Sequence, residues 1–90
     1  MAVEVRIPTI LRSYTAGAKA VDGGGVTLRE VIDSVESGHP GIKDRLIDGE
    51  DLRRFINVYV NDEDVRFMGG LDTPVADGDV VVVLPAVAGG

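Results

Sequence analysis

Residues 80–90 read VVVVLPAVAGG, and this stretch decides the fold that we expect. Side chains of a strand alternate between the two faces of its sheet, so the apolar run at 80–84 presents apolar groups on both faces. Such a run is typical of a central strand that is buried on both sides. Pro85 cannot donate a hydrogen bond to a neighbouring strand. We therefore expect the strand to stop there and residues 85–90 to form a flexible tail.

The tail has a composition that suits a narrow channel. Six extended residues reach at most about 20 Å, which is long enough to thread the active-site tunnel of a partner. Ala86, Ala88, Gly89 and Gly90 add almost no width, and glycine adopts backbone conformations that other residues avoid. We expect Ala86, Val87, Ala88 and Gly89 to thread the partner's active site and the Gly90 carboxylate to react there. The alternative is an incidental, frayed terminus.

A terminal carboxylate is a poor electrophile at neutral pH, so it needs activation before it can react. Transfer of AMP from ATP would convert it into a mixed anhydride with a good leaving group. A sulfur donor or a lysine amine could then attack the carbonyl carbon of Gly90. The chain would supply the reachable carboxyl group, and other proteins would supply the catalysis.

The preceding residues predict one α+β domain over 1–84, ahead of the tail at 85–90. Residues 3–7 alternate apolar and charged side chains, as half-buried strands do. Residues 16–22 predict a weaker second strand. Residues 54–60 predict a third, and 65–67 a short return strand. The expected order is two strands, a helix, a strand, a short strand and the apolar strand.

The helix is predicted over 27–38, TLREVIDSVESG. Thr27 can cap its first turn, and Glu30 completes a capping box. Four apolar residues fall at helical spacing and form one stripe: Leu28, Val31, Ile32 and Val35. Residues 41–48 predict a further short helical turn.

One helix can cover only one face of the sheet. One of two alternate sets must then point away from it: either Val81 and Val83, or Val80, Val82 and Leu84. Phe55 and Tyr59 are expected on that second face too. An apolar patch without an internal cover suggests a protein-binding surface. The alternative is that residues 68–76 fold over it.

Composition excludes several classes of function. The net charge of −6 argues against nucleic acid, because phosphates would repel this surface. The chain lacks cysteine and any apolar run near the ~20 residues of a membrane span, so we expect no membrane partner and a cytoplasmic location. His39 and the acidic turns at 48–51 and 61–64 lack the pattern of a catalytic or metal site. We expect a carrier or binding module, without a catalytic residue or metal, rather than an enzyme.

Three segments carry a resemblance to a known family: IPTILR (7–12), FINVYVNDEDVRF (55–67) and DGDVVVVLPAVAGG (77–90). With them the chain resembles the ubiquitin-like sulfur carriers, a family that includes ThiS, MoaD and CysO, and it is most similar to the CysO type. The resemblance implies a β-grasp (ubiquitin-like) fold. That fold has a mixed sheet of four to five strands with one main helix on one face.

The resemblance also implies a mechanism. An ATP-dependent adenylating enzyme of the ubiquitin-activating type would adenylate Gly90, and sulfur would convert the carboxylate into a thiocarboxylate. ATP would be used by that enzyme, and the carrier itself would bind no cofactor. A PLP-dependent cysteine synthase would accept the sulfur, and a metallopeptidase would regenerate Gly90. Molybdopterin, thiamin or natural-product synthesis remain open as pathways.

By family analogy, the outward sheet face docks the activating enzyme. The matching residues would be Phe55, Tyr59, Phe67, Leu71 and Val87. Two other classes use the same architecture. One is a ubiquitin-like modifier joined to lysines through its terminal glycine. The other is a plain β-grasp interaction domain with an incidental tail.

Overall fold

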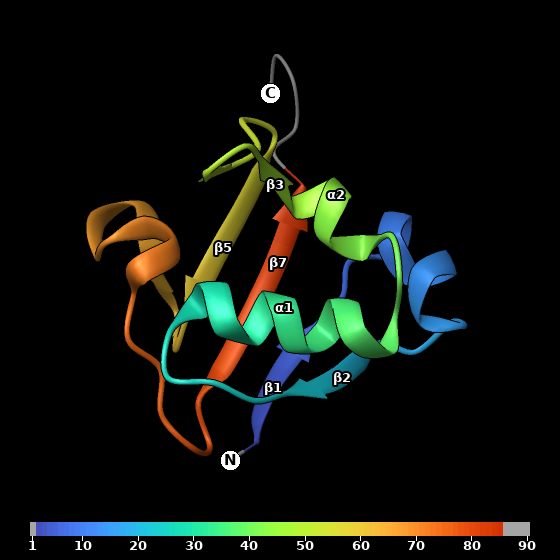
Figure 1. Ribbon diagram of the computed structural model, residues 1–90, viewed down its shortest axis with the longest axis horizontal. Helices are drawn as coiled ribbons and strands as arrows, with labels where there is room; N and C mark the ends of the chain where they lie inside the picture. Colours follow the sequence, from blue (N-terminus) through green and yellow to red (C-terminus); the bar gives the residue numbers. More distant parts are fainter. Residues whose placement is uncertain (1, 86–90) are drawn as a thin grey trace.

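The central position expected for the apolar strand is confirmed. The computed structural model describes residues 2–85 (Figure 1). In it β7 (Val80–Pro85) lies between β1 (Val3–Arg6), its parallel neighbour, and β5 (Ile56–Val60), its antiparallel neighbour. The strand includes Pro85, opposite Ile56, and so runs one residue further than expected. Residues 86–90, and with them the predicted tail, lie outside the described part of the chain.

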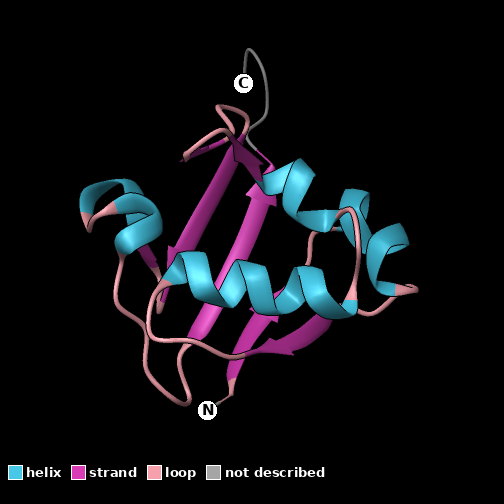
Figure 2. Cartoon of the chain, viewed as in Figure 1, coloured by secondary structure: helices cyan, strands magenta, loops and turns pink. Residues whose placement is uncertain are grey.

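Two edge strands complete a mixed sheet. β2 (Ala20–Gly23) pairs antiparallel with β1, and β6 (Glu63–Asp64) pairs antiparallel with β5, which gives the order β2-β1-β7-β5-β6. A separate small hairpin joins β3 (Ile47–Asp48) to β4 (Asp51–Leu52). The main helix, α1 (Leu28–Gly38), crosses one face of the sheet (Figures 1 and 2).

The sheet is buried on one face only. Val81 and Val83 are buried beneath the helices together with Val58, whereas Val80 and Val82 on the other face are half-buried and Leu84 is exposed. The expectation that one alternate set of β7 side chains points away from the helix is therefore confirmed, and this set is Val80, Val82 and Leu84. The second face has no helix over it within residues 2–85, as Figure 2 shows.

Residues 68–76 do not cover that second face, so this alternative is wrong. The predicted return strand at 65–67 is instead a short 3₁₀ helix (Val65–Phe67), followed by another at Gly70–Asp72, because the strand pairing ends at Asp64. The Asp64 carboxylate accepts a hydrogen bond from Arg66 N at 2.9 Å and caps the turn. Leu28 N donates to Thr73 O at 2.9 Å, which ties the segment to the helix side of the sheet.

The predicted strand at 16–22 begins later, at Ala20. A 3₁₀ helix (Thr9–Thr15) occupies the preceding residues and ends in a left-handed turn at Ala16 (φ 55°) and Gly17 (φ 87°). Positive φ angles are incompatible with an extended strand, so pairing with β1 starts only beyond this turn.

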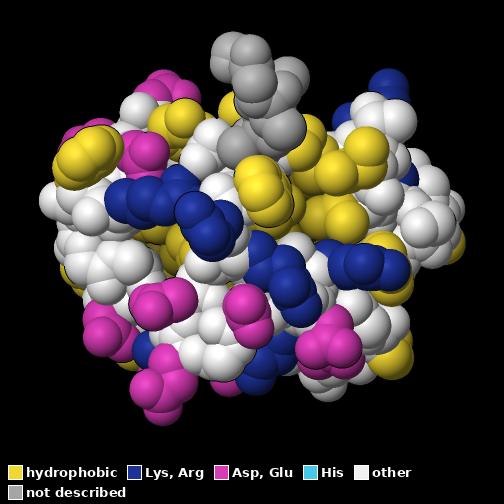
Figure 3. All heavy atoms as spheres, turned by 90° about the horizontal axis from the view of Figure 1, so that it is seen from above, with side chains coloured by type: hydrophobic (Ala, Val, Ile, Leu, Met, Phe, Trp, Pro, Cys, Tyr) yellow, Lys and Arg dark blue, Asp and Glu magenta, His cyan; other side chains and the backbone are white. Residues whose placement is uncertain are grey.

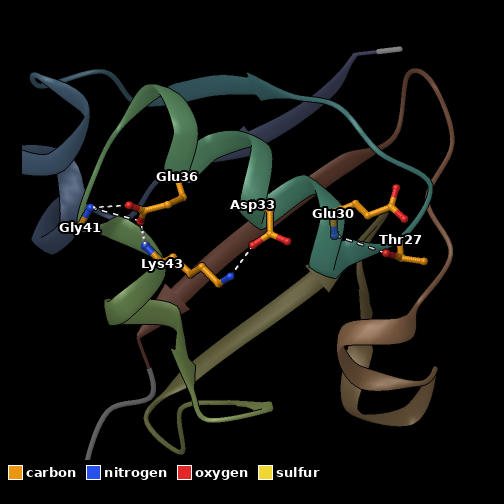
Figure 4. Close-up of polar contacts among 6 residues, drawn as sticks. All are labelled: Thr27, Glu30, Asp33, Glu36, Gly41 and Lys43. Carbon is orange, nitrogen blue, oxygen red and sulfur yellow. Dashed lines mark hydrogen bonds and ion pairs between the residues drawn. The ribbon is translucent and has the colours of Figure 1, made fainter.

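The amino-terminal end of α1 is capped nearly as expected. Thr27 Oγ1 accepts a hydrogen bond from Glu30 N at 3.3 Å (Figure 4). The Glu30 carboxylate accepts from Val26 N at 3.0 Å, one residue before the position that a capping box uses. The four residues of the predicted apolar stripe are all buried.

A single carboxylate fixes the corner between α1 and the short α2 (Ile42–Leu46), which confirms the helical turn expected after residue 41. Glu36 accepts hydrogen bonds from Gly41 N at 3.0 Å and Lys43 N at 2.8 Å (Figure 4). These backbone donors hold the pKa of Glu36 below its ordinary value. Lys43 Nζ pairs with Asp33, one turn back along α1.

Truncation of a buried α1 side chain tests how the packing of this helix against the sheet contributes to stability. Leu28 is fully buried, so Leu28→Ala removes apolar contacts and leaves a cavity. We expect it to lower the free energy of unfolding by about 2–5 kcal/mol in urea denaturation. Val26→Ala, at an exposed side chain two residues earlier, should change it by less than about 0.5 kcal/mol. Equal losses would contradict this packing.

The Glu36 corner predicts a defined acid dependence. Because its pKa is lowered in the folded state, the stabilisation is complete above the ordinary value of 4.5. It is lost as pH falls through the folded-state value. The difference in unfolding free energy between wild type and Glu36→Gln should therefore shrink below pH 4.5. Glu50→Gln, outside the corner, should show no such trend. A similar pH dependence in Glu50→Gln would mean that the effect comes from the overall charge of the protein and not from the hydrogen bonds of Glu36.

Candidate functional site

The carboxyl end of β7 determines where the predicted tail begins. Pro85 lies opposite Ile56 and Leu84 opposite Asn57, so the chain leaves the middle of the sheet rather than an edge. The carboxyl end of β7 lies near α2 and β3 (Figure 1). The predicted reactive Gly90 and the predicted threading residues, Ala86 to Gly89, lie outside the described residues and stay predictions.

A hollow of about 740 Å³ opens at this end of the molecule, which we call the tail-base pocket. Pro85 forms part of its wall, and the others come from three segments that are far apart in the sequence: the first 3₁₀ helix, the α2–β3 segment and the turn before β5. The lining residues are Ile10, Leu11, Ser13, Tyr14, Arg45, Asp48, Arg53, Arg54, Phe55, Ile56 and Pro85.

The four described docking candidates do not form one surface. Phe55 is 65% exposed and lines the tail-base pocket, whereas Tyr59 is half-buried and pairs with Val82 in the sheet. Phe67 is 89% exposed but follows β6, at the sheet edge. Leu71 is only 4% exposed and belongs to the core, so its assignment to a docking surface is wrong. Val87, the fifth candidate, lies outside the described residues.

Sequence reasoning missed the basic side chains of the pocket. Arg45, Arg53 and Arg54 line it, against one acidic lining residue, Asp48. Figure 3 views the molecule from this end and shows hydrophobic and basic side chains side by side. The adjacent arginines directly before Phe55 were the one local signal. Arg45 comes to the pocket only through the fold.

Two of these arginines are held in place. Arg45 Nε donates to the Tyr14 hydroxyl at 2.7 Å, and its guanidinium carbon lies 5.8 Å from the ring centroid. The bond raises the pKa of Arg45 above its ordinary value. Arg53 Nε donates to Asp44 O at 2.6 Å. Arg66 braces the same turn, donating to Ile56 O at 2.7 Å.

Groups of metal ligands and membrane-spanning helices are absent from the described part of the chain. Residues 2–85 bring together no group of three or more metal-ligating His, Cys, Asp or Glu side chains. Within the same range, every helix is too short or too polar to cross a membrane.

Comparisons with known proteins agree with the sequence resemblance. The model of the ThiS family matches residues 5–90. The sulfur carrier protein CysO of Mycobacterium tuberculosis is 57% identical over the full length of both chains. The crystal structure of the Amycolatopsis orientalis BexX/CysO complex contains a chain with a TM-score of 0.95 and 64% identity, covering 99% of this chain and 100% of that one.

A relative of another kind matches less of the chain. Small archaeal modifier protein 3 of Haloferax volcanii is 38% identical over 64 residues, which is 71% of this chain and 70% of its own length. The expected β-grasp fold, with five strands in the mixed sheet and one main helix, is confirmed. This chain belongs to the ThiS family of ubiquitin-like proteins.

Proposed function

We propose that this protein is a sulfur carrier that transports sulfur as a thiocarboxylate on Gly90. The observation that carries the proposal is the 57% identity to a CysO sulfur carrier along the entire length of both chains. The family match that extends to residue 90 adds support. The position of β7 agrees, since a central strand presents the following residues at one end of the domain.

The chemistry needs two steps at one carbonyl carbon. A Gly90 carboxylate oxygen attacks the α-phosphorus of ATP, pyrophosphate leaves, and an acyl adenylate forms. Hydrosulfide then attacks the carbonyl carbon and expels AMP, and loss of the remaining S–H proton leaves a thiocarboxylate. The carrier's role is to present a carboxylate to the enzymes that perform these steps, which fits a carrier rather than an enzyme.

The partners follow from these steps. An adenylating enzyme of the ubiquitin-activating type consumes the ATP, and the carrier holds no cofactor of its own. A PLP-dependent cysteine synthase is the acceptor that similarity to CysO favours, with a metallopeptidase to release the product and restore Gly90. The CysO-like chain solved together with BexX supports a carrier that docks to a partner protein.

A second candidate function is conjugation to protein lysines. The similarity to a small archaeal modifier protein favours it. A lysine amine would attack the same acyl adenylate and form an amide bond. The two functions therefore share the activation step and differ only in the nucleophile.

The terminal residue provides the direct test of sulfur transfer. Protein incubated with ATP, sulfide and its adenylating enzyme should gain the mass of one oxygen-to-sulfur exchange in intact mass spectrometry. Deletion of Gly90 should abolish the gain, because the reacting carboxylate is displaced, and should leave the thermal unfolding midpoint unchanged. Ala86→Gly, a tail change that keeps the terminal Gly-Gly, should still be sulfurated. Sulfuration of the deletion variant would refute the assignment of Gly90.

The nucleophile separates the two candidates. In extract from the source cells, tagged protein should appear as a free thiocarboxylate or a small-molecule adduct rather than as conjugates of higher mass. Peptide mass spectrometry after protease digestion checks whether Gly90 is joined to lysine side chains. Abundant lysine conjugates that disappear with the Gly90 deletion would favour the modifier function.

A further inference from the structure

The tail-base pocket has a local charge opposite to that of the protein. The chain carries 15 acidic and 9 basic side chains, yet three arginines and one aspartate line this pocket. The ion pairs formed among residues 2–85 involve Arg6, Arg29 and Lys43 and leave Arg45, Arg53 and Arg54 outside them. A basic hollow attracts carboxylates, and its charge opposes a symmetric dimer in which the pockets of two copies face each other.

The pocket combines these charges with exposed apolar groups. Ile10 is 63% exposed and Phe55 is 65% exposed, and both line the pocket beside Pro85. Tyr14 holds the Arg45 side chain, and Asp44 O holds that of Arg53. Restrained guanidinium groups lose less side-chain freedom on binding, and they form bidentate hydrogen bonds with carboxylates. Aromatic side chains and arginine are also the residue types enriched at interfaces.

Geometry connects the pocket with the activation step. Pro85 belongs to the pocket wall, and five further residues extend at most about 17 Å beyond it. An enzyme that takes the tail into its active site must therefore approach this end of the molecule. The pocket, whose wall includes Pro85, belongs to the surface that such an enzyme approaches.

We propose that the tail-base pocket binds an acidic segment of the adenylating enzyme, one in which carboxylates flank apolar side chains. The carboxylates pair with Arg45 and Arg54, and the apolar side chains cover Phe55 and Ile10. This inference rests on the proposed function, since it names the docking site that the activation step needs. It moves the main docking contact from the outward sheet face to the end of the domain.

Equilibrium binding without ATP tests the inference apart from the chemistry. Isothermal titration calorimetry would compare the full chain with Arg54→Glu and Arg45→Glu, each against the adenylating enzyme. Each pocket variant should bind about tenfold more weakly, because reversal replaces attraction with repulsion. Arg29→Glu makes the same charge change on α1, outside the pocket, and should stay within about twofold of wild type. Wild-type affinity should fall as salt rises.

Three outcomes would overturn the inference: unchanged binding by both pocket variants, an equal loss in Arg29→Glu, or tighter binding by the pocket variants. Tighter binding would indicate that the enzyme presents basic rather than acidic side chains to the pocket. Phe55→Ser should weaken binding without changing its salt dependence, which checks the apolar contact separately. If the wild-type protein binds the enzyme but gains no sulfur, the proposed function is contradicted. The inference about the docking site would still hold.

Discussion

The pairing of β7 on both sides is the constraint on which the rest of the structure depends. Its parallel ladder with β1 joins the first strand of the chain to the last. Its antiparallel ladder with β5 joins the last strand to a strand from the middle of the sequence. Val81 and Val83 then lie beneath α1 and α2 and complete the core. Because β7 is central, the position of its carboxyl end on the domain does not depend on the edge strands β2 and β6.

The same topology builds the tail-base pocket. The end of β7 meets the first 3₁₀ helix, α2 and the turn before β5, which come from three separate parts of the sequence. Hydrogen bonds add to the buried side chains of Leu11, Leu46 and Ile56 at this end: they join Arg45 to Tyr14, Arg53 to Asp44 and Arg66 to Ile56. The central position of β7 and the basic tail-base pocket beside its end therefore both result from the same sheet topology.

Sequence patterns predicted the elements whose signals are local. The alternation at 3–7, the helical stripe from Leu28 and the apolar run at 80–84 all led to the correct elements. The predictions failed where contacts between residues far apart in the sequence determine the position of a side chain. Leu71 reads as a loop residue but is buried against α1, and the apolar run at 80–84 did not by itself decide which of its valines face the helices. The arginine cluster was hidden because Arg45 and Arg54 meet only after folding.

The register of β7 has a mechanical consequence. A force applied to β7 at Pro85 along the strand axis would act across the ladder bonds to β5, because these bonds run perpendicular to the strands. Such a load shears the paired residues from Ile56–Pro85 to Val60–Val81 all at once, instead of peeling them apart one by one. The parallel pairs with β1 resist the same displacement. This pairing on both sides therefore gives β7 shear resistance against a force applied at its carboxyl end.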